Sequence, residues 1–327
     1  MASPTLSVII PNYNHAHALP DCLAAVLSQT VPATEVIVID DGSTDNSIAV
    51  LETFARQHPT IKLYRNDRNR GVLFTMNRGL DLAKGDYVFF LAADDLTMPG
   101  LFEKALGLLA QHPLAAFCGG ITEFQDIGTG LNYYYGLNVA DKPCYLTPAE
   151  MVQRSCEGRM LMFATPMILR RQAVLEAGKY YPELKWCTDW FTAWVAGYRH
   201  GVCYLPEVLG KFSKSSTSYS GKGMRDPKER YEIYRHILDH LDWPEYQDVS
   251  YLMRKGATLA QFGKEMLWLV LRNRQYRRYL TFPFLKQSLW WSFRVEMKKI
   301  LPVFLARWYF KVAGYGQAPK PQAAKLL

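Results

Sequence analysis

The feature that most constrains the fold of this chain is a pair of adjacent carboxylates, Asp94 and Asp95, which follows directly on the apolar segment 87–91. That segment is typical of a buried β-strand, and Pro99 indicates that a helix begins shortly after it. Such a strand places two carboxylates at the carboxyl edge of a sheet, where open α/β folds bind their ligands. Because adjacent carboxylates repel each other, a divalent cation or a shared proton would stabilise the pair. The alternative is that one of them only caps the next helix.

A second acidic pair, Asp40 and Asp41, occupies the same position after the apolar segment 36–39. This segment has no polar alternation, which predicts a strand buried on both faces, and Gly42 indicates a turn into a helix that ends near Gln57. A carboxylate at a strand end can accept hydrogen bonds from a nucleobase imide or a ribose hydroxyl. Two acidic strand ends in one sheet therefore predict a nucleotide whose phosphates are bridged by a metal ion.

Strands and helices alternate through the first part of the chain. Further strands are expected at residues 6–10 and 61–65, with helices near 19–28 and before Gly85. A repeat of roughly 25–30 residues predicts an α/β fold with a doubly wound, mostly parallel sheet flanked by helices. The chain has neither Gly-x-Gly-x-x-Gly nor Gly-x-x-x-x-Gly-Lys-Ser/Thr, which excludes a dinucleotide fingerprint and a P-loop. A metal at the strand-end carboxylates remains as the means of holding phosphate.

Taken in order, these motifs resemble the family 2 glycosyltransferases of the GT-A fold. The segments that carry the resemblance are Ser7-Val8-Ile9-Ile10-Pro11-x-Tyr13-Asn14, Val38-Ile39-Asp40-Asp41-Gly42-Ser43-x-Asp45, Asn69-x-Gly71, Asn77-x-Gly79 and Gly85-Asp86-Tyr87 through Asp94-Asp95. The resemblance is dense over residues 5–111, thinner over 112–220, and fades in the C-terminal third. It implies transfer of a sugar from a nucleotide-diphosphate sugar, with UDP ahead of GDP or dTDP, inversion at the anomeric carbon, and a divalent metal, Mn²⁺ or Mg²⁺.

Carried over by position, the resemblance assigns roles to five residues. Asp41 matches the acid that reads the nucleobase, and Tyr13 matches the ring that stacks on the base. Pro11 supplies backbone at the floor of the same nucleobase site. Asp94 and Asp95 match the end of the acidic metal-binding motif, and Asp94 also belongs to the donor nucleotide site. We therefore expect these residues to form one donor and metal site.

The chain departs from the family pattern at two places. Many relatives carry a further acid two positions before Asp94, where this chain has Ala92, so diphosphate oxygens and water would fill more of the metal shell, as Mg²⁺ and Mn²⁺ allow. Relatives often carry Tyr-Arg-x-His in the segment that closes over the diphosphate. The matching segment, residues 208–218, has Lys211 and Lys214 but no histidine. Either these lysines face the diphosphate from a lid, or the segment is an ordinary solvated loop.

Inversion also requires a general base for the acceptor hydroxyl. The family places this base on an acid before an aromatic-rich helix and after a Gly-x-x-aromatic segment, which begins here at Gly178. The matching acid is Asp189, preceded by Thr188, and it is our candidate catalytic residue. The alternative is that Asp189 caps the helix 190–198. The two roles are compatible, because a cap position also exposes the carboxylate.

Positive charge is concentrated in the C-terminal third. Residues 223–327 hold 19 Lys and Arg against 9 Asp and Glu, and within 251–311 there are 13 basic and 2 acidic residues together with four tryptophans. No apolar run approaches the ~18–20 residues of a membrane-spanning helix. This composition predicts helices that lie on an anionic membrane surface. Packing against the catalytic domain or an oligomer contact is the main alternative, and nucleic acid is not expected as a partner, because no nucleic-acid module matches.

These observations predict a catalytic domain over residues 1–222, with a nucleotide-binding half at about 1–111 and an acceptor half at about 112–222. A basic aromatic helical region (223–313) and a disordered tail (314–327) follow. The six cysteines show no Cys-x-x-Cys spacing, which is typical of reduced intracellular thiols, and no signal peptide is expected. The expected location is therefore cytoplasmic, peripheral on the inner face of the cell membrane, with a glycan or lipid-linked glycan as acceptor.

Two other function classes stay open at this point. A nucleotidyltransferase has a similar α/β core, but its glycine-rich phosphate-binding signature after the first strand is missing. The other class is a non-catalytic protein that binds a sugar nucleotide or a membrane. Ala92 and the missing histidine are the two features that support it. Neither the sugar, the linkage nor the oligomeric state follows from the sequence.

Overall fold

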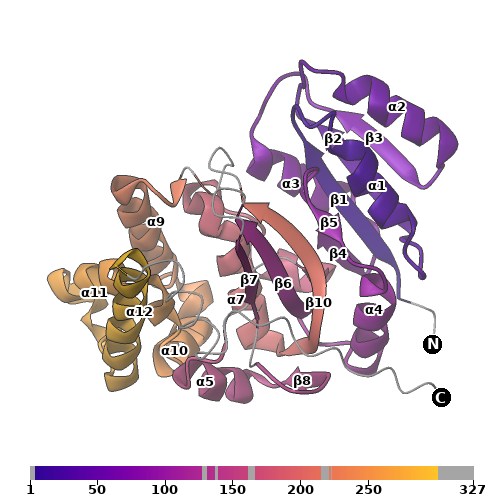
Figure 1. Cartoon of the computed structure of the whole chain (residues 1–327). Coiled ribbons are helices and arrows are strands. Elements are labelled where there is room, and N and C mark those ends of the chain that lie inside the picture. The colour runs from indigo at the N-terminus through magenta and orange to yellow at the C-terminus, as the bar shows by residue number, and fades with distance from the viewer. Residues whose placement is uncertain are drawn as a thin grey trace.

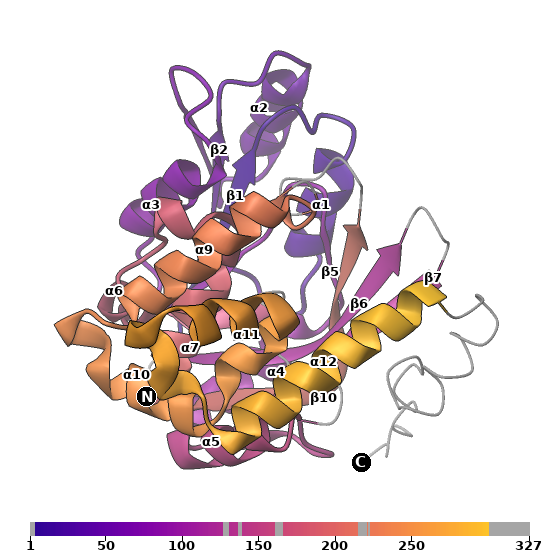
Figure 2. The same cartoon turned by 90° about the vertical axis from the view of Figure 1, so that its left-hand side faces the viewer.

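A mixed sheet flanked by helices organises the protein, as Figures 1 and 2 show for a computed structural model that describes residues 4–126, 131–136, 139–160, 166–214, 221 and 223–300. In the described part, the strand order is β3-β2-β1-β4-β9-β6-β10-β5, with β7 paired to β6 and β8 to β10. The strands are β1 Leu6–Asn12, β2 Glu35–Asp40, β3 Ile61–Arg65, β4 Tyr87–Phe90, β5 Leu96–Thr97, β6 Phe117–Asp126, β7 Leu131–Tyr135, β8 Cys144–Leu146, β9 Met167–Arg170 and β10 Val202–Lys214.

Helices cover both faces of this sheet and extend beyond it. The α-helices are α1 Leu19–Leu27, α2 Ser47–Gln57, α3 Val72–Leu82, α4 Leu101–Gln111, α5 Pro148–Cys156, α6 Arg171–Glu176, α7 Thr188–His200, α9 Pro227–His240, α10 Gln247–Lys255, α11 Gly263–Arg272 and α12 Phe282–Ile300. Short 3₁₀ helices are η1 Pro182–Cys187, η2 Pro244–Tyr246, η3 Thr258–Phe262 and η4 Arg274–Tyr279. The predicted fold class, an α/β fold with C-terminal helices, is confirmed.

The first four strands along the sequence, β1 to β4, are parallel, and β1 lies between β2 and β4. The residue pairs Pro11↔Ile39 and Asn12↔Asp40 lie side by side in this register. Because the carboxyl ends of parallel strands meet at one edge, the end of β1 and both acidic pairs come together there. The strand pairing thus explains why segments 30 to 50 residues apart can build one site.

Alternate residues of these strands enter two separate cores. On β1, Val8 and Ile10 pack with α1 and α4, whereas Ile9 packs with α3 on the opposite face. This alternation is the period of a strand that is buried on both faces. Helix α3 lies so close to the sheet that a Cβ at Gly79 would be 2.4 Å from Cγ2 of Ile9.

The C-terminal helices pack against the sheet domain through α7 and η1. Trp190 of α7 packs edge-to-face on Phe262 of η3 with ring centroids 4.8 Å apart, and its Nε1 donates a hydrogen bond to Gln261. Figure 1 shows α9–α12 at the end of the molecule opposite β3 and α2. Buried residues of these helices belong to the same core as α7. The domain division at residue 222 stays a prediction, and the expected tail lies outside the described residues.

Two helical glycines provide a matched test of the α3 packing. Gly79→Ala should lower the free energy of unfolding by about 1–3 kcal/mol, because its methyl group collides with Ile9. Gly107→Ala, in α4, meets no atom within 4 Å and should raise stability by about 0.5–1 kcal/mol, since alanine is the better helix former. Urea unfolding of both variants measures the difference. Equal effects would contradict the close approach of α3 to β1.

Candidate active site

A cavity of about 640 Å³ lies at the carboxyl ends of β1, β2 and β4. It collects residues that are far apart in the sequence. Five of the residues predicted to form the site line it: Pro11, Tyr13, Asp41, Asp94 and Asp189. The structure therefore brings the expected donor residues and the expected base to one cavity.

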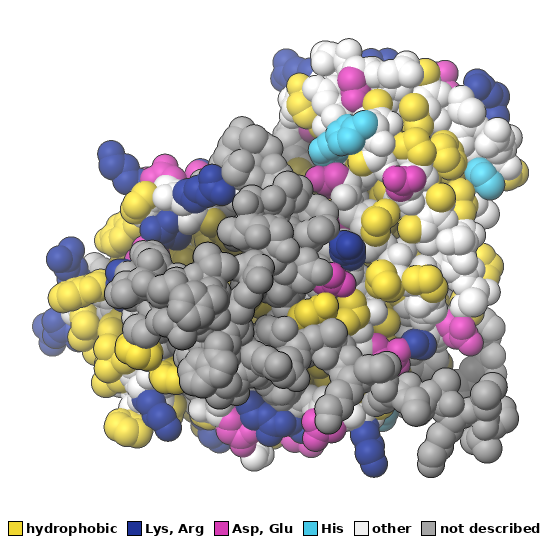
Figure 3. All heavy atoms as spheres, in the orientation of Figure 1, with side chains coloured by type: hydrophobic (Ala, Val, Ile, Leu, Met, Phe, Trp, Pro, Cys, Tyr) yellow, Lys and Arg dark blue, Asp and Glu magenta, His cyan; other side chains and the backbone are white. Residues whose placement is uncertain are grey.

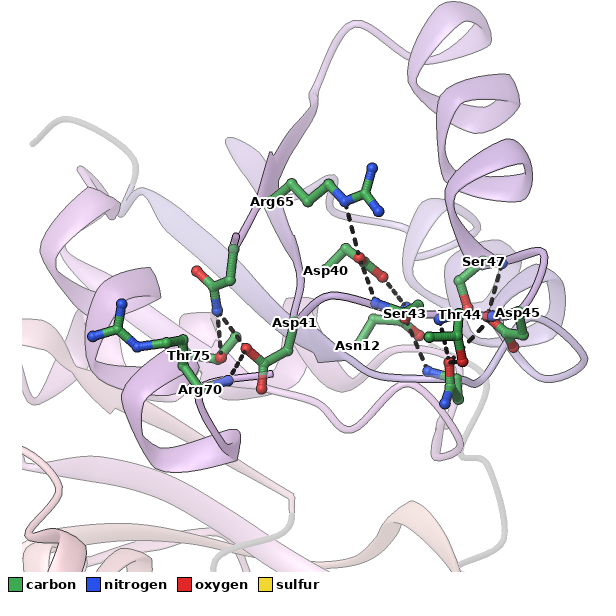
Figure 4. A network of polar contacts seen from close by, with 12 residues as sticks. Asn12, Asp40, Asp41, Ser43, Thr44, Asp45, Ser47, Arg65, Arg70 and Thr75 are labelled. Carbon is green, nitrogen blue, oxygen red and sulfur yellow. Dashed lines mark hydrogen bonds and ion pairs between the residues drawn. The ribbon is translucent and has the colours of Figure 1, made fainter. Parts of the chain in front are cut away.

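The two acids after β2 have different surroundings (Figure 4). Asp40 is fully buried and accepts hydrogen bonds from Asn12 Nδ2 (2.9 Å) and the Ser43 backbone N–H (3.0 Å). These bonds hold the turn after β2 against the end of β1. Asp40 therefore supports the turn, and Asp41 is the one that borders the cavity.

Asp41 is held by the loop between β3 and α3. Its Oδ1 accepts hydrogen bonds from Asn66 Nδ2 (2.6 Å) and from the Arg70 backbone N–H (2.8 Å), and its Oδ2 accepts one from the Gly71 backbone N–H (2.8 Å). An ionised carboxylate offers about four acceptor positions. One position thus remains on Oδ2 for a donor group of a ligand in the cavity.

Glycines make this arrangement sterically feasible. Gly42, directly after Asp41, has φ +74°, and a Cβ there would lie 2.7 Å from the backbone carbon of Arg68. Gly71 has φ +89° and precedes α3 without a side-chain cap. Both positions lie in the left-handed region that favours glycine. The Asp-Asp-Gly and Asn-x-Gly motifs thus let two loops approach each other around the Asp41 carboxylate.

The acids after β4, unlike those after β2, separate into one exposed and one buried residue. Asp94 is exposed and lines the cavity, whereas Asp95 is 4% exposed and is not among the lining residues. Burial, with a smaller contribution from the charge of Asp94, raises the pKa of Asp95 well above its usual value. The neighbouring Cys22 is buried as well, and its own burial together with the charges of Asp95 and Asp94 raises its pKa to about 12.

The Asp94–Asp95 pair fits a hard divalent cation. Its donors are carboxylate oxygens, and within the described residues the Asp95 carboxyl receives no hydrogen bond that would otherwise stabilise its charge. No group of three or more His, Cys, Asp or Glu side chains in the described part of the chain could hold a metal. The protein would thus supply two ligands at most, and Mg²⁺ or Mn²⁺ commonly completes its shell with phosphate oxygens and water.

Asp189 lies in the first turn of α7, where its Oδ1 accepts a hydrogen bond from the Trp190 backbone N–H (2.7 Å). The helix begins at Thr188, with Cys187 as its N-cap, so Asp189 lies inside the helix rather than at the cap position. Burial raises the pKa of Asp189 to about 6, although the backbone hydrogen bonds of Trp190 and of Asp189 itself oppose this shift. Such a carboxylate is mostly ionised at neutral pH yet binds a proton more tightly than an ordinary aspartate.

The segment before Asp189 contacts both α3 and the C-terminal helix α9. Asn77 of α3 donates from Nδ2 to the Tyr180 carbonyl (2.8 Å) and accepts the Tyr180 N–H at Oδ1 (3.1 Å). Lys185 of η1 forms an ion pair with Glu229 of α9 (3.1 Å). Lys185 also has φ +45° and ψ −123°, a strained conformation for a residue other than glycine.

The predicted lysines of β10 lie at the end of a strand that borders the cavity. Phe212 lines the cavity, while its neighbour Lys211 does not; neighbouring residues of a strand point to opposite faces. The side chain of Lys214 lies outside the described residues. A diphosphate contact for either lysine stays a prediction.

Sequence reasoning left several cavity residues without a role. The most consequential is Lys185, because it is the one lysine or arginine among the described residues that line the cavity. Its sequence position, between the Gly178 segment and Asp189, was the only available signal. The other unassigned lining residues are Asn12, His15, Asn69, Gly71, Val72, Leu73, Thr75, Met76, Ala93, Trp186, Thr188 and Phe212.

Comparison with known proteins places the chain in a family. The model of the family described as Glycosyl transferase family 2 matches residues 7–177. The uncharacterized glycosyltransferase YibD of Escherichia coli is 26% identical over 320 residues, which cover 89% of this chain and 92% of YibD. A PGL/p-HBAD biosynthesis glycosyltransferase of Mycobacterium bovis is 41% identical over 95 residues, which cover 29% of this chain and 37% of that protein.

Solved structures share the fold at low sequence identity. Residues 1–349 of S. aureus TarS in complex with UDP-GlcNAc are 18% identical with a TM-score of 0.60, over 87% of this chain and 78% of that one. The mannosyltransferase PcManGT from Pyrobaculum calidifontis, in complex with GDP-Man and Mn²⁺, is 17% identical with a TM-score of 0.52, over 90% of this chain and 88% of that one.

Proposed function

The chain belongs to the family 2 glycosyltransferases and is an enzyme of that family, and from this premise we propose that it is a metal-dependent, inverting transferase. Its donor would be a nucleotide-diphosphate sugar and its acceptor a hydroxyl of a glycan or a lipid-linked glycan. One observation carries this proposal: Asp41, Asp94 and Asp189, from three distant segments, line a single cavity. A donor-reading acid, a metal-binding acid and a base are the groups that such a transfer needs.

The nucleotide half of the cavity suits a nucleobase. The remaining acceptor position on Asp41 matches an imide or amide N–H of the base, and the ring of Tyr13, 40% exposed, offers a surface for stacking. We propose UDP as the first donor nucleotide, ahead of GDP and dTDP. The bound UDP-GlcNAc of TarS supports this order, and the GDP-Man of PcManGT makes GDP the main alternative.

Asp94 and Asp95 would hold Mn²⁺ or Mg²⁺ in this proposal. When bound, the cation would neutralise charge that develops on the departing diphosphate. Asp94 is already exposed to the cavity, while burial keeps Asp95 in place beneath it. The Mn²⁺ in the PcManGT complex supports a metal-dependent site.

Asp189 would act as the general base. Its raised pKa, about 6, leaves it ionised at neutral pH and able to accept the proton of the acceptor hydroxyl as that oxygen attacks the anomeric carbon. Inversion requires only this one displacement, so a single base suffices. Asn77 of α3 binds the Tyr180 backbone, and Thr192 of α7 donates to the adjacent Lys179 carbonyl, so these contacts hold the base relative to the donor residues.

The base can be tested separately from donor binding. Asp189→Asn should reduce turnover by about 10²–10⁴-fold and leave the thermal shift produced by donor unchanged, because the base faces the acceptor. In the parent enzyme, kcat/KM should fall as pH decreases through about 6, where Asp189 becomes protonated. Asp21→Asn, an exposed acid in the first turn of α1, is the matched control. Full turnover by Asp189→Asn would exclude the assignment.

Metal binding has its own test in nucleotide-dependent stabilisation. Asp94→Asn and Asp95→Asn should both abolish the extra rise in Tm that Mn²⁺ adds to UDP, compared with UDP and EDTA. Because burial already favours the neutral form of Asp95, an amide should replace it with little loss of folding stability. Retention of the Mn²⁺-dependent shift in both variants would contradict the metal site.

The C-terminal helices present a surface that supports membrane association. Two tryptophans stand out, Trp268 of α11 (57% exposed) and Trp290 of α12 (52% exposed). Other exposed apolar side chains on the two helices are Leu271, Phe282, Leu285, Leu289 and Phe293. Figure 3 shows hydrophobic and basic side chains together at the edge where Figure 1 places α11 and α12.

We propose that this surface rests on anionic lipid while the opposite side of the helices packs on α7. Amphipathic helices with exposed aromatic and basic residues bind membrane interfaces in this way. Among the helices of the described part of the chain, none has the length and hydropathy needed to cross a bilayer.

Charge reversal tests the membrane surface without removing helices. Changing the exposed Arg272, Arg274 and Arg277 to Glu should strongly reduce binding to vesicles that contain anionic lipid, because each nearby basic residue contributes about 1 kcal/mol. Arg278 is left unchanged, since it pairs with Asp242.

The control reverses three exposed basic residues at the other end of the molecule, Arg56, Lys62 and Arg68. It should leave vesicle binding intact, and turnover on a short soluble acceptor should persist in both triple variants. Absence of vesicle binding by the parent protein at low salt would exclude the membrane role.

A further inference from the structure

A second depression, of about 560 Å³, lies between α3 and η1. It shares Gly71, Val72, Leu73 and Lys185 with the central cavity, so the two spaces lie next to each other. We call this depression the basic groove and define it by Arg70, Phe74, Arg78, Pro182 and Lys185. It lies beside the segment that carries the expected base, since Lys185 lines the groove and stands four residues before Asp189 in the sequence.

The charges of the two spaces are opposite. Three carboxylates, Asp41, Asp94 and Asp189, line the central cavity with Lys185 as its only described lysine or arginine. The basic groove has three cations and one acid, Asp81, which pairs with Lys179. An anionic ligand without a bound metal would therefore favour the groove over the cavity.

The cations of the groove keep hydrogen-bonding capacity for a ligand. The Arg70 guanidinium lies 4.1 Å from the ring centroid of Phe74, and its ion pair with Asp67 is long (3.8 Å) and exposed, so it contributes little. Arg78 uses Nη1 to bind Asn66 and the Arg65 carbonyl, which leaves other N–H donors of its guanidinium. Phe74 and Pro182 add apolar surface against which a sugar ring can pack.

The backbone of Lys185 is a second, independent observation. Its φ of +45° and ψ of −123° are unfavourable for lysine, and such strain persists where the surrounding structure maintains it, frequently at ligand sites. The ion pair with Glu229 holds the ammonium group at the junction of groove and cavity. A glycine or asparagine would fit this backbone better. The presence of a lysine here despite the strain therefore points to a role for its side chain.

We propose that the basic groove binds an anionic group of the acceptor, a carboxylate or a phosphate, and thereby places the acceptor hydroxyl at Asp189. This inference rests on the proposed transferase function and adds the acceptor class to it: an acidic glycan. Arg70 and Lys185 are the residues that recognise the anion. Phe74 and Pro182 contact the neighbouring sugar.

Binding of defined oligomers to the full-length protein tests the groove without any turnover. The probes are tetragalacturonate, a glycerol phosphate tetramer and neutral chitotetraose, measured by calorimetry at low and high salt. At least one anionic probe should bind, more weakly at high salt, and the neutral probe should bind at least about tenfold more weakly. Comparison of the two anionic probes distinguishes carboxylate from phosphate.

Two variants locate the binding in the groove. Arg70→Gln removes one cation, and Lys185→Gly removes another while relieving the backbone strain; each should weaken the anionic probe about tenfold. Arg68→Gln, an exposed arginine of the same loop that does not line the groove, should have no effect. Arg78 is avoided, because its bond to Asn66 supports the Asp41 network.

The outcomes separate this proposal from the proposed function. Donor binding, followed in parallel as the thermal shift with UDP and Mn²⁺, reports on the transferase site. If the donor binds but the anionic probes do not, or bind equally to Arg70→Gln and Lys185→Gly, the groove proposal is overturned and the transferase stands. If the probes bind in the groove but no nucleotide-sugar is bound or turned over, the transferase proposal fails and the acceptor role fails with it.

Discussion

The hydrogen bonding of the Asp41 carboxylate is the constraint on which the remaining site depends. A buried charge requires donors, and all three come from the loop before α3: Asn66, Arg70 and Gly71. These bonds set the start of α3, and α3 in turn holds the Tyr180 backbone through Asn77. Helix α7 begins eight residues later. The acid that would read the donor and the acid that would serve as base are thereby linked by one short series of polar contacts.

Two carboxylates of the site destabilise the fold at neutral pH. The pKa of Asp189, about 6, lies above its usual value, so the folded state binds this proton more tightly than the unfolded chain does. The associated stability is present in acid and is lost as pH rises through about 6. Asp95 acts in the same direction. Extensive aromatic packing beside α7, such as Trp190 on Phe262, offsets this cost.

The sequence predicted the parts of the site that short parallel strands position and missed the parts that depend on tertiary detail. Strand-end acids could be found because a buried strand in a parallel sheet has an unambiguous carboxyl end. The faces of β10 could not be assigned, because its pairing with β6 shifts register between Tyr204 and Gly210, and a shift of one residue reverses every side chain. Lys185 was missed because a positive φ and an ion pair from α9 bring it to the cavity. Neither feature has a local sequence signature.

The C-terminal helices pack on the sheet domain with one side and carry exposed aromatic and basic residues on the other. One side packs on η1 and α7, where Trp186 contacts Tyr234 and Glu229 holds Lys185. The other side carries exposed aromatic and basic residues such as Trp268 and Arg272. Helix α9 connects the two sides, because its Arg230 pairs with Glu265 of α11 and its Glu229 pairs with Lys185 at the cavity. Because close-packed interiors transmit strain, the proposed membrane surface and the proposed acceptor groove would be coupled through this one helix rather than act independently.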